Sequence, residues 1–329
     1  MKAIPLHKLS FVLMLLLLVP VIAYSQGKQA NYWYFGYHTG LNFNTGSPPP
    51  TVLSNGMTSN DQSEFNGTAS ISDSEGNLLF YSDGRTIWNK SHNIMLNGSE
   101  MGWYSTQGAM IVPDPTNADL YYFFNFNWAG SGSPYNFQYS VIDMSLDGGL
   151  GGVVADKKSI LLVENTTTHL SAVFHKNKED IWVVTHGLND SKFYSFLVTS
   201  TGLLSPMVSN AGTVCDSQIG YMKISPNGNK IAISQYQSIA YVSFFDLLDF
   251  NNENGVVSDV HLVHNQINSF GLEFSPDNKV LYSNAGFLQF YQYDLTAGTP
   301  EQIIQSQVQL TNEFLSVGAL QLAPDGKIY

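Results

Sequence analysis

The chain has 329 residues, with 14 Lys and Arg residues against 26 Asp and Glu residues, which gives a formal net charge of −12. Arg85 is its only arginine. An acidic chain with one arginine lacks the basic face that nucleic acids and anionic membrane surfaces require, so we expect neither as a partner. Aromatic residues (13%) exceed charged residues (12%), which favours strands around a large core and argues against disorder.

Residues 1–25 have the arrangement of a secretory signal peptide. Lys2 and Lys8 form a basic region, Phe11–Val19 is an unbroken apolar run, and Ala23 and Ser25 are small residues before Gln26. This order predicts cleavage before Gln26 and export of the mature chain, 26–329. The uncharged run is shorter than the roughly 20 residues that span a bilayer, and no later segment approaches that length, so no membrane span is expected.

Cys215 is the only cysteine, so the exported chain cannot form an internal disulfide. We expect Cys215 to be a small buried apolar residue, and packing of a large core to hold the fold together.

A period of about 50 residues runs through the mature chain. Three clear copies of an apolar–turn–apolar pattern surround Pro226, Pro276 and Pro324, which are 50 and 48 residues apart. Proline followed by Asn or Asp favours a tight turn, so each copy predicts a β-hairpin. With three weaker upstream copies, hairpins are expected near residues 69–81, 110–123, 172–184, 222–233, 272–282 and 320–329.

A further aromatic-rich strand follows most of these hairpins and ends in Asp143, Asp246 or Asp294. We interpret these aspartates as turn residues whose carboxylates cap local N–H groups where a strand ends. Three or four strands per unit at this period are typical of propeller blades, and no long stretch after residue 25 has helical apolar spacing. The prediction is an all-β propeller of six or seven blades. The last blade is expected to be incomplete in this chain, with residues 31–45 pairing beside it.

Several motifs together resemble the N-terminal WD-repeat-like propeller of large surface proteins of gliding bacteria. They include Asn31-Tyr-Trp33-Tyr-Phe35-Gly36, Gly76-Asn-Leu-Leu-Phe80-Tyr81-Ser-Asp83-Gly84, Asp147-Gly-Gly-Leu-Gly151 and Trp182-Val-Val-Thr-His186. The similarity covers nearly all of 31–329. It implies a cell-surface module, a full-length form that continues into immunoglobulin-like or PKD repeats, and a sorting domain read by the type IX secretion system. It implies no catalytic residues.

No motif predicts a catalytic, metal or cofactor site. His261 and His264 lie three apart on a predicted strand and so on opposite faces, and His186 is expected either to face the ring axis or to bond a neighbouring blade. Ser82-Asp83-Gly84-Arg85-Thr86 resembles part of the Asp-box of propeller sialidases, but those enzymes need several arginines. Neighbouring carboxylates such as Asp73 and Glu75 lie at predicted turns, where solvated acids are normal.

Loop aromatics are the better candidates for function. Trp103 and Tyr104 follow Gly102, and Trp128 and Tyr135 flank a segment rich in Gly and Ser. Such rings can form a rigid stacking surface for a sugar or a peptide, or they can fold inward between blades. Two functions remain open at this point. One is a non-catalytic binding or display module for an extracellular glycan or protein, and the other is a secreted hydrolase or lactonase-like enzyme with an axial cleft.

Overall fold

The computed structural model describes residues 27–45, 49–58, 67–128, 130, 134–237, 242–264, 269–285, 289–311 and 318–329. The predicted signal peptide, residues 1–25, lies outside the described residues. In the described part of the chain no helix is long and apolar enough to cross a membrane.

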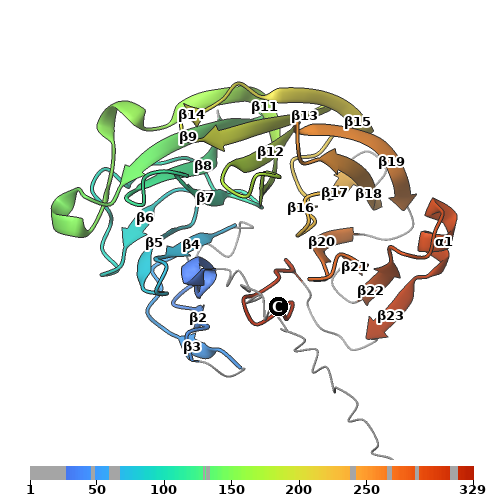
Figure 1. Ribbon diagram of the computed structural model, residues 1–329, viewed down its shortest axis with the longest axis horizontal. Coiled ribbons are helices and arrows are strands. Elements are labelled where there is room, and N and C mark those ends of the chain that lie inside the picture. The colour runs from blue at the N-terminus through green and yellow to red at the C-terminus, as the bar shows by residue number, and fades with distance from the viewer. Residues whose placement is uncertain are drawn as a thin grey trace, which may run out of the picture.

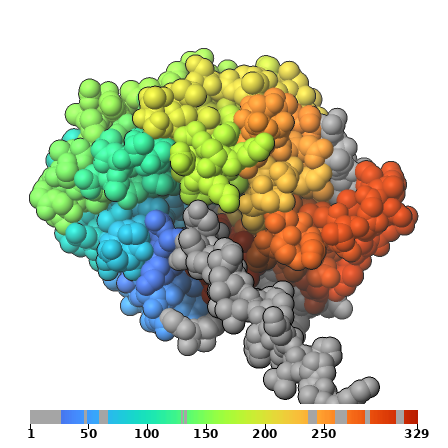
Figure 2. Space-filling model, viewed as in Figure 1, coloured from blue at the N-terminus to red at the C-terminus, as the bar shows by residue number. Residues whose placement is uncertain are grey.

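The strands form antiparallel groups that follow one another around a ring, from blue to red in Figure 1. The first group is β1 (Tyr32–Tyr34), β2 (Gly40–Asn42) and β3 (Thr51–Leu53), and the second is β4 (Ala69–Ser72), β5 (Leu78–Ser82) and β6 (Ile87–Asn89). The third is β7 (Ala109–Pro113), β8 (Leu120–Trp128), β9 (Tyr135–Asp143) and β10 (Gly152–Val153). The space-filling view in Figure 2 shows the same succession over the surface.

Strand β11 (Ile160–Phe174) connects the third group to the fourth. Its first part pairs with β9 and its last part with β12, and Thr166 lies at the change, opposite both Tyr135 and Gly187. The fourth group adds β12 (Ile181–Gly187), β13 (Asp190–Thr199), β14 (Gly202–Leu203) and β15 (Met207–Cys215). One long strand therefore belongs to two blades.

Two four-stranded groups complete the series. One contains β16 (Met222–Ile224), β17 (Lys230–Gln237), β18 (Val242–Asn251) and β19 (Val256–His264). The other contains β20 (Ser269–Phe274), β21 (Val280–Ala285), β22 (Gln289–Asp294) and β23 (Val308–Thr311). A final hairpin with a bridge between Leu322 and Ile328 follows near the middle of the ring.

Antiparallel pairing occurs at every position where the repeat pattern predicted a hairpin. The pairs are β4 with β5, β7 with β8, β11 with β12, β16 with β17, β20 with β21, and the Leu322–Ile328 bridge. The innermost strands of successive groups contact one another around the ring. The chain is thus an all-β propeller.

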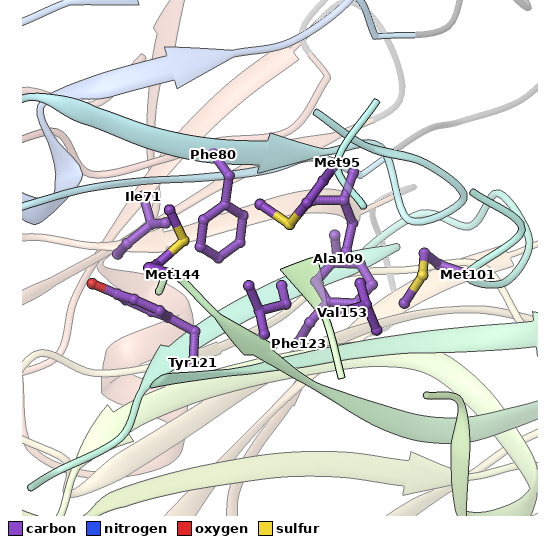
Figure 3. Packing of buried hydrophobic residues seen from close by; sticks show 11 residues of the cluster. Ile71, Phe80, Met95, Met101, Ala109, Tyr121, Phe123, Met144 and Val153 are labelled. Atoms are coloured by element: carbon purple, nitrogen blue, oxygen red, sulfur yellow. The ribbon is translucent and has the colours of Figure 1, made fainter. Parts of the chain in front are cut away.

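The core lies between the blades, because each buried apolar cluster joins two neighbouring sheets face to face. Buried clusters join the first group to the second, the second to the third, and so on to the β16–β19 and β20–β23 groups. Figure 3 shows the cluster between the second and third groups, where Phe80 of β5 lies near Met95, Tyr121 and Phe123. The Phe80 and Tyr121 rings meet edge to face with centroids 5.4 Å apart.

Short helices interrupt the strand pattern in a few places. These are the 3-10 turns η1 (Lys28–Ala30), η2 (Asp147–Gly149) and η3 (Ala155–Lys157) and the six-residue helix α1 (Pro300–Gln305). Thr299 and Gln302 form a capping box at the start of α1, and Ile303 anchors the helix in the last of the inter-blade clusters.

Two of the three strand-end aspartates act as predicted, and the third does not. Asp143 accepts hydrogen bonds from the backbone and hydroxyl of Ser145, and Asp294 does the same with Thr296. Asp246 instead lies inside β18, fully buried, and accepts hydrogen bonds from the backbone and hydroxyl of Thr213 in the preceding blade. The turn prediction for Asp246 was wrong because β18 continues to Asn251.

The two ends of the ring meet through aromatic side chains. The Tyr329 ring lies 6.1 Å from that of Trp33 and 5.7 Å from that of Phe43, centroid to centroid. Residues 31–45 thus contact the final hairpin, while β1 forms its backbone ladder with β2.

Candidate functional site

Three chain segments meet at one end of the second and third groups, and they bring the four predicted aromatic residues together. Trp103 and Tyr104 lie in the segment that enters β7, Trp128 ends β8, and Tyr135 begins β9 directly opposite Trp128. Arg85 lies in the turn between β5 and β6. We call these five residues the aromatic–arginine cluster.

The rings contact one another and are partly exposed. The Trp103 ring lies 5.4 Å from that of Trp128 and 6.3 Å from that of Tyr104, centroid to centroid. The Tyr135 hydroxyl donates a 2.9 Å hydrogen bond to the Tyr104 carbonyl oxygen. All four rings have intermediate exposure, so they neither fold fully into the core nor stand free in solvent.

The guanidinium of Arg85 lies over two of these rings. Its Cζ is 5.3 Å from the centroid of Trp103 and 5.5 Å from that of Tyr104. A guanidinium over an aromatic face is attracted by the ring quadrupole, and this attraction limits the rotamers of the long side chain. The cluster therefore combines stacking surfaces with one positive charge.

The turn that carries Arg85 is fixed by its own side chains. The buried Asp83 carboxylate accepts hydrogen bonds from the backbone N–H groups of Arg85 and Thr86. Gly84 has φ +88°, and a Cβ at this position would lie 2.7 Å from the Gly108 oxygen, so a side chain is excluded twice over. The partial Asp-box motif thus forms a rigid turn that holds Arg85 against the neighbouring blade.

Two buried amides hold the segment that carries Trp103. Asn125 of β8 and Gln138 of β9 are register partners, and the Gln138 Nε2 donates both to the Asn125 Oδ1 and to the Met101 carbonyl oxygen. The Asn125 Nδ2 donates in turn to the Gly84 oxygen. The backbone N–H of Trp103 donates to the Phe126 carbonyl oxygen at 2.8 Å. The backbone of the Arg85 turn and that of the Trp103 segment are therefore both bonded to strands β8 and β9.

The sequence predicted the four aromatic residues as a candidate surface, but it did not predict that Arg85 contacts them. Arg85 is 18 positions before Trp103 and belongs to the preceding blade. Two features of the sequence could have indicated Arg85. It is the only arginine, and it lies in a turn at the same end of the repeat as Trp103. The buried amides gave no signal, because Asn and Gln inside a strand are not distinguishable from exposed ones by pattern.

A second group of polar side chains links neighbouring blades. Gln107 bonds two following blades, since its Oε1 accepts from the backbone N–H groups of Leu170 and Met222 and its Nε2 donates to the Met222 oxygen. The Tyr221 hydroxyl donates to the Thr106 oxygen, and the Ser234 hydroxyl to the Phe270 oxygen. These bonds join blades to one another.

His169 and His186 are fully buried in this region, and their ring centroids are 6.4 Å apart. His169 bonds the Thr167 hydroxyl and the Ser234 oxygen, each at 2.8 Å, and His186 Nδ1 bonds the Gly187 oxygen. Burial lowers the pKa of His169 to about 3 and that of His186 to about 4. Both rings are therefore neutral at physiological pH. The His186 ring bonds Gly187 and packs edge to face on Phe193, both in its own blade. The side chains of His261 and His264 lie outside the described ones.

The remaining chemistry-bearing residues have structural positions. Cys215 is buried, and desolvation raises the pKa of its thiol to about 12. The Asp73 carboxylate accepts from the backbone N–H groups of Glu75 and Asn77 within its turn. Within the described ranges no group of three or more His, Cys, Asp or Glu side chains could hold a metal ion.

Comparison with known proteins returned structural matches but no family model and no curated relative. The chain is similar to the β-propeller domain of Cps50 (Swd1) from Myceliophteria thermophila, with 10% identity, coverage of 90% of this chain and 93% of that one, and a TM-score of 0.46. It is similar to a candidate 6-phosphogluconolactonase from Bacteroides uniformis, with 12% identity, coverage of 85% and 79%, and a TM-score of 0.46. A third match, Kuenenia stuttgartiensis hydrazine synthase, has 13% identity, coverage of 79% and 88%, and a TM-score of 0.39.

Proposed function

We propose that this chain is an exported, non-catalytic β-propeller that binds a glycan or protein ligand through the aromatic–arginine cluster. The observation that carries the proposal is the convergence of Trp103, Trp128 and Arg85 from separate segments onto one partly exposed surface. Trp, Tyr and Arg are the residues that dominate binding energy at interfaces, and aromatic faces also stack on sugar rings.

The rigidity of this surface supports binding over a purely structural role. The Asn125 and Gln138 amides and the Asp83 carboxylate hold the backbone of the Arg85 turn and of the segment that leads to Trp103. A surface that is ordered before the ligand arrives loses less conformational entropy on binding. Rings that served only to fill the core would be covered, whereas these four keep part of their surface accessible.

The two buried histidines support the non-catalytic side of the proposal. A general acid or base works best with a pKa near the operating pH. Burial moves the pKa of His169 and of His186 well below that range, and the His169 ring nitrogens are used in bonds that hold Thr167 and the Ser234 strand.

Export is the second part of the proposal, and it rests on the signal peptide pattern of residues 1–25. The resemblance to surface proteins of gliding bacteria extends it to display at the cell surface through the type IX route. N-terminal sequencing of protein from the producing cell should give a chain that starts near Gln26. Membrane-bound protein with Met1 intact would rule this part out.

A glycan array together with a hydrolase and lactonase screen tests the binding function. The mature chain should bind at least one array member without turnover, and Trp103→Ala and Trp128→Ala should each weaken that binding. Tyr37→Ala is the matched control, because Tyr37 is an exposed ring outside the cluster (56% accessible). Turnover of a polysaccharide or lactone, or unchanged binding by both tryptophan variants, would contradict the proposal.

A further inference from the structure

The guanidinium of Arg85 has no protein acceptor among the described residues. Its side-chain contacts there are the faces of Trp103 and Tyr104, and no carboxylate of the described chain pairs with it. Exposed lysines of the same chain do have such partners, for example Lys176 with Glu253 and Lys279 with Asp277. In a chain of net charge −12, an arginine without a carboxylate is notable because acidic residues are abundant.

The position of Arg85 is set by its backbone rather than by an ion pair. Its N–H donates to Asp83 Oδ1 at 3.1 Å, and its carbonyl oxygen accepts from the Met101 N–H at 2.9 Å. The side chain is partly exposed and rests on rings that are themselves fixed. A guanidinium held over an aromatic face keeps its N–H groups at the edge of the plane, where an acceptor can approach in the same plane.

We propose that the aromatic–arginine cluster recognises a sugar carboxylate, as in a uronic acid or a sialic acid, within an otherwise neutral glycan. This inference rests on the proposed binding function and names its ligand class. The fork of Arg85 donates two parallel N–H bonds to the two carboxylate oxygens, and the faces of Trp103 and Trp128 stack on the adjacent sugar rings.

The charge of the chain decides between an isolated carboxylate and a polyanion. One arginine matches one carboxylate, while the negative net charge of the chain as a whole repels a ligand with a dense run of negative charge. Densely sulfated glycans and polyuronates are therefore disfavoured. A neutral chain with an occasional acidic branch or end fits both the rings and the single cation.

Matched probes isolate the carboxylate. The first probe is xylotriose carrying one glucuronic acid, and its partner is the carboxyl-reduced form, in which the acid is a primary alcohol. Sialyllactose and its carboxyl-reduced form make the second pair, so that the two sources of a sugar carboxylate are told apart. Calorimetric titration of the mature chain should give an affinity for one acidic probe at least about tenfold higher than for its reduced form, equivalent to about 1.4 kcal/mol.

The variants test whether Arg85 reads that group. Arg85→Gln should lower the affinity for the acidic probe about tenfold or more and should lower the affinity for the reduced probe by a clearly smaller factor. Arg85→Lys should lose most of the preference for the acidic probe because an ammonium lacks the planar fork. Lys90→Gln is the control for charge, since it removes one exposed cation from the same blade without touching the cluster. Circular dichroism and melting curves establish that each variant is folded.

The outcomes separate this inference from the proposed function. Equal affinity for an acidic probe and its reduced form, or an Arg85→Gln protein with full acidic preference, overturns the carboxylate assignment. If the reduced probe still binds in that case and Trp103→Ala abolishes its binding, the proposed binding function stands although the carboxylate assignment is wrong. If neither pair binds and the glycan array is also empty, both the inference and the glycan-binding function are wrong.

Discussion

The Lys223 ammonium lies 2.9 Å from the Glu273 carboxylate, although the two residues belong to different blades. Both side chains are largely buried, with exposed fractions of 12% and 6%. Lys223, Glu273 and Gln321 occupy the same position in three successive repeat copies, and the Lys223 Nζ also donates to the Gln321 Oε1 at 2.6 Å. Equivalent positions in blades that are not neighbours can meet only close to the ring axis. The ion pair and the hydrogen bond to Gln321 therefore join the last three repeats there.

Glu273→Gln should destabilise the fold by about 3 kcal/mol, because it leaves the Lys223 charge buried without its partner. The double variant Glu273→Gln with Lys223→Met should recover part of this loss, since no buried charge then remains. Urea unfolding of the three proteins measures the difference. Asp277→Asn is the control at an exposed pair, where we expect a change within about 1 kcal/mol. A Glu273→Gln protein as stable as the parent would contradict the role of the pair.

The buried histidines should make the fold sensitive to mild acid. The pKa of His169 is about 3 and that of His186 about 4 in the fold, while unfolded histidine titrates near about 6.5. The unfolded state therefore takes up these protons first, so the stabilisation is complete above about pH 6.5 and is lost as the pH falls toward the folded values. Each histidine contributes a slope of up to about 1.4 kcal/mol per pH unit.

His169→Gln and His186→Gln should each reduce this slope between about pH 6.5 and pH 5, even though each also lowers stability at neutral pH. Urea unfolding at several pH values in that window measures it. His175→Gln is the matched control, because His175 lies in an exposed turn beside Glu253. If the free energy of unfolding changes with pH equally in the parent and in both buried-site variants, the claim that burial lowers the pKa of these two histidines is contradicted.

The inter-blade clusters should respond strongly to truncation. Phe80 is fully buried between the second and third groups and meets the Tyr121 ring edge to face. Phe80→Ala should therefore cost about 3–5 kcal/mol in unfolding free energy, through lost transfer energy and the cavity left behind. Val52→Ala, at an exposed position (72% accessible), should change stability by no more than about 0.5 kcal/mol. Similar unfolding midpoints for the two variants would contradict this placement of the core.

The blades were predictable because each repeat carries its own turn chemistry. Ser275 shows why: its hydroxyl accepts from the backbone N–H groups of Lys279 and Val280, so the Ser-Pro-Asp turn closes by local bonds alone. The placement of Arg85 was not predictable in the same way, because its contact with Trp103 depends on the packing of one blade against the next. The turn role predicted for Asp246 was wrong for the same reason, since its hydrogen-bond partner Thr213 is 33 residues away in another blade.

The aromatic residues fall between these cases. The composition of the loops around Trp103 and Trp128 marked them as surface candidates, but only the pairing of β8 with β9 brings Trp128 opposite Tyr135 and beside Trp103. The repeat pattern did not predict helix α1, which begins at the capping box of Thr299 and Gln302.

The most direct test of the binding surface uses the indole N–H resonances of the five tryptophans. Titration with xylotriose carrying one glucuronic acid, followed by NMR, reports on each indole separately once single variants have assigned the signals. The signals of Trp103 and Trp128 should shift with ligand concentration. Those of Trp88, which is buried, and Trp182, whose indole donates to the Asn252 oxygen at 3.1 Å, should stay in place. Shifts confined to Trp88 or Trp182, or no shift at Trp103 and Trp128 with any ligand that the chain binds, would contradict the account.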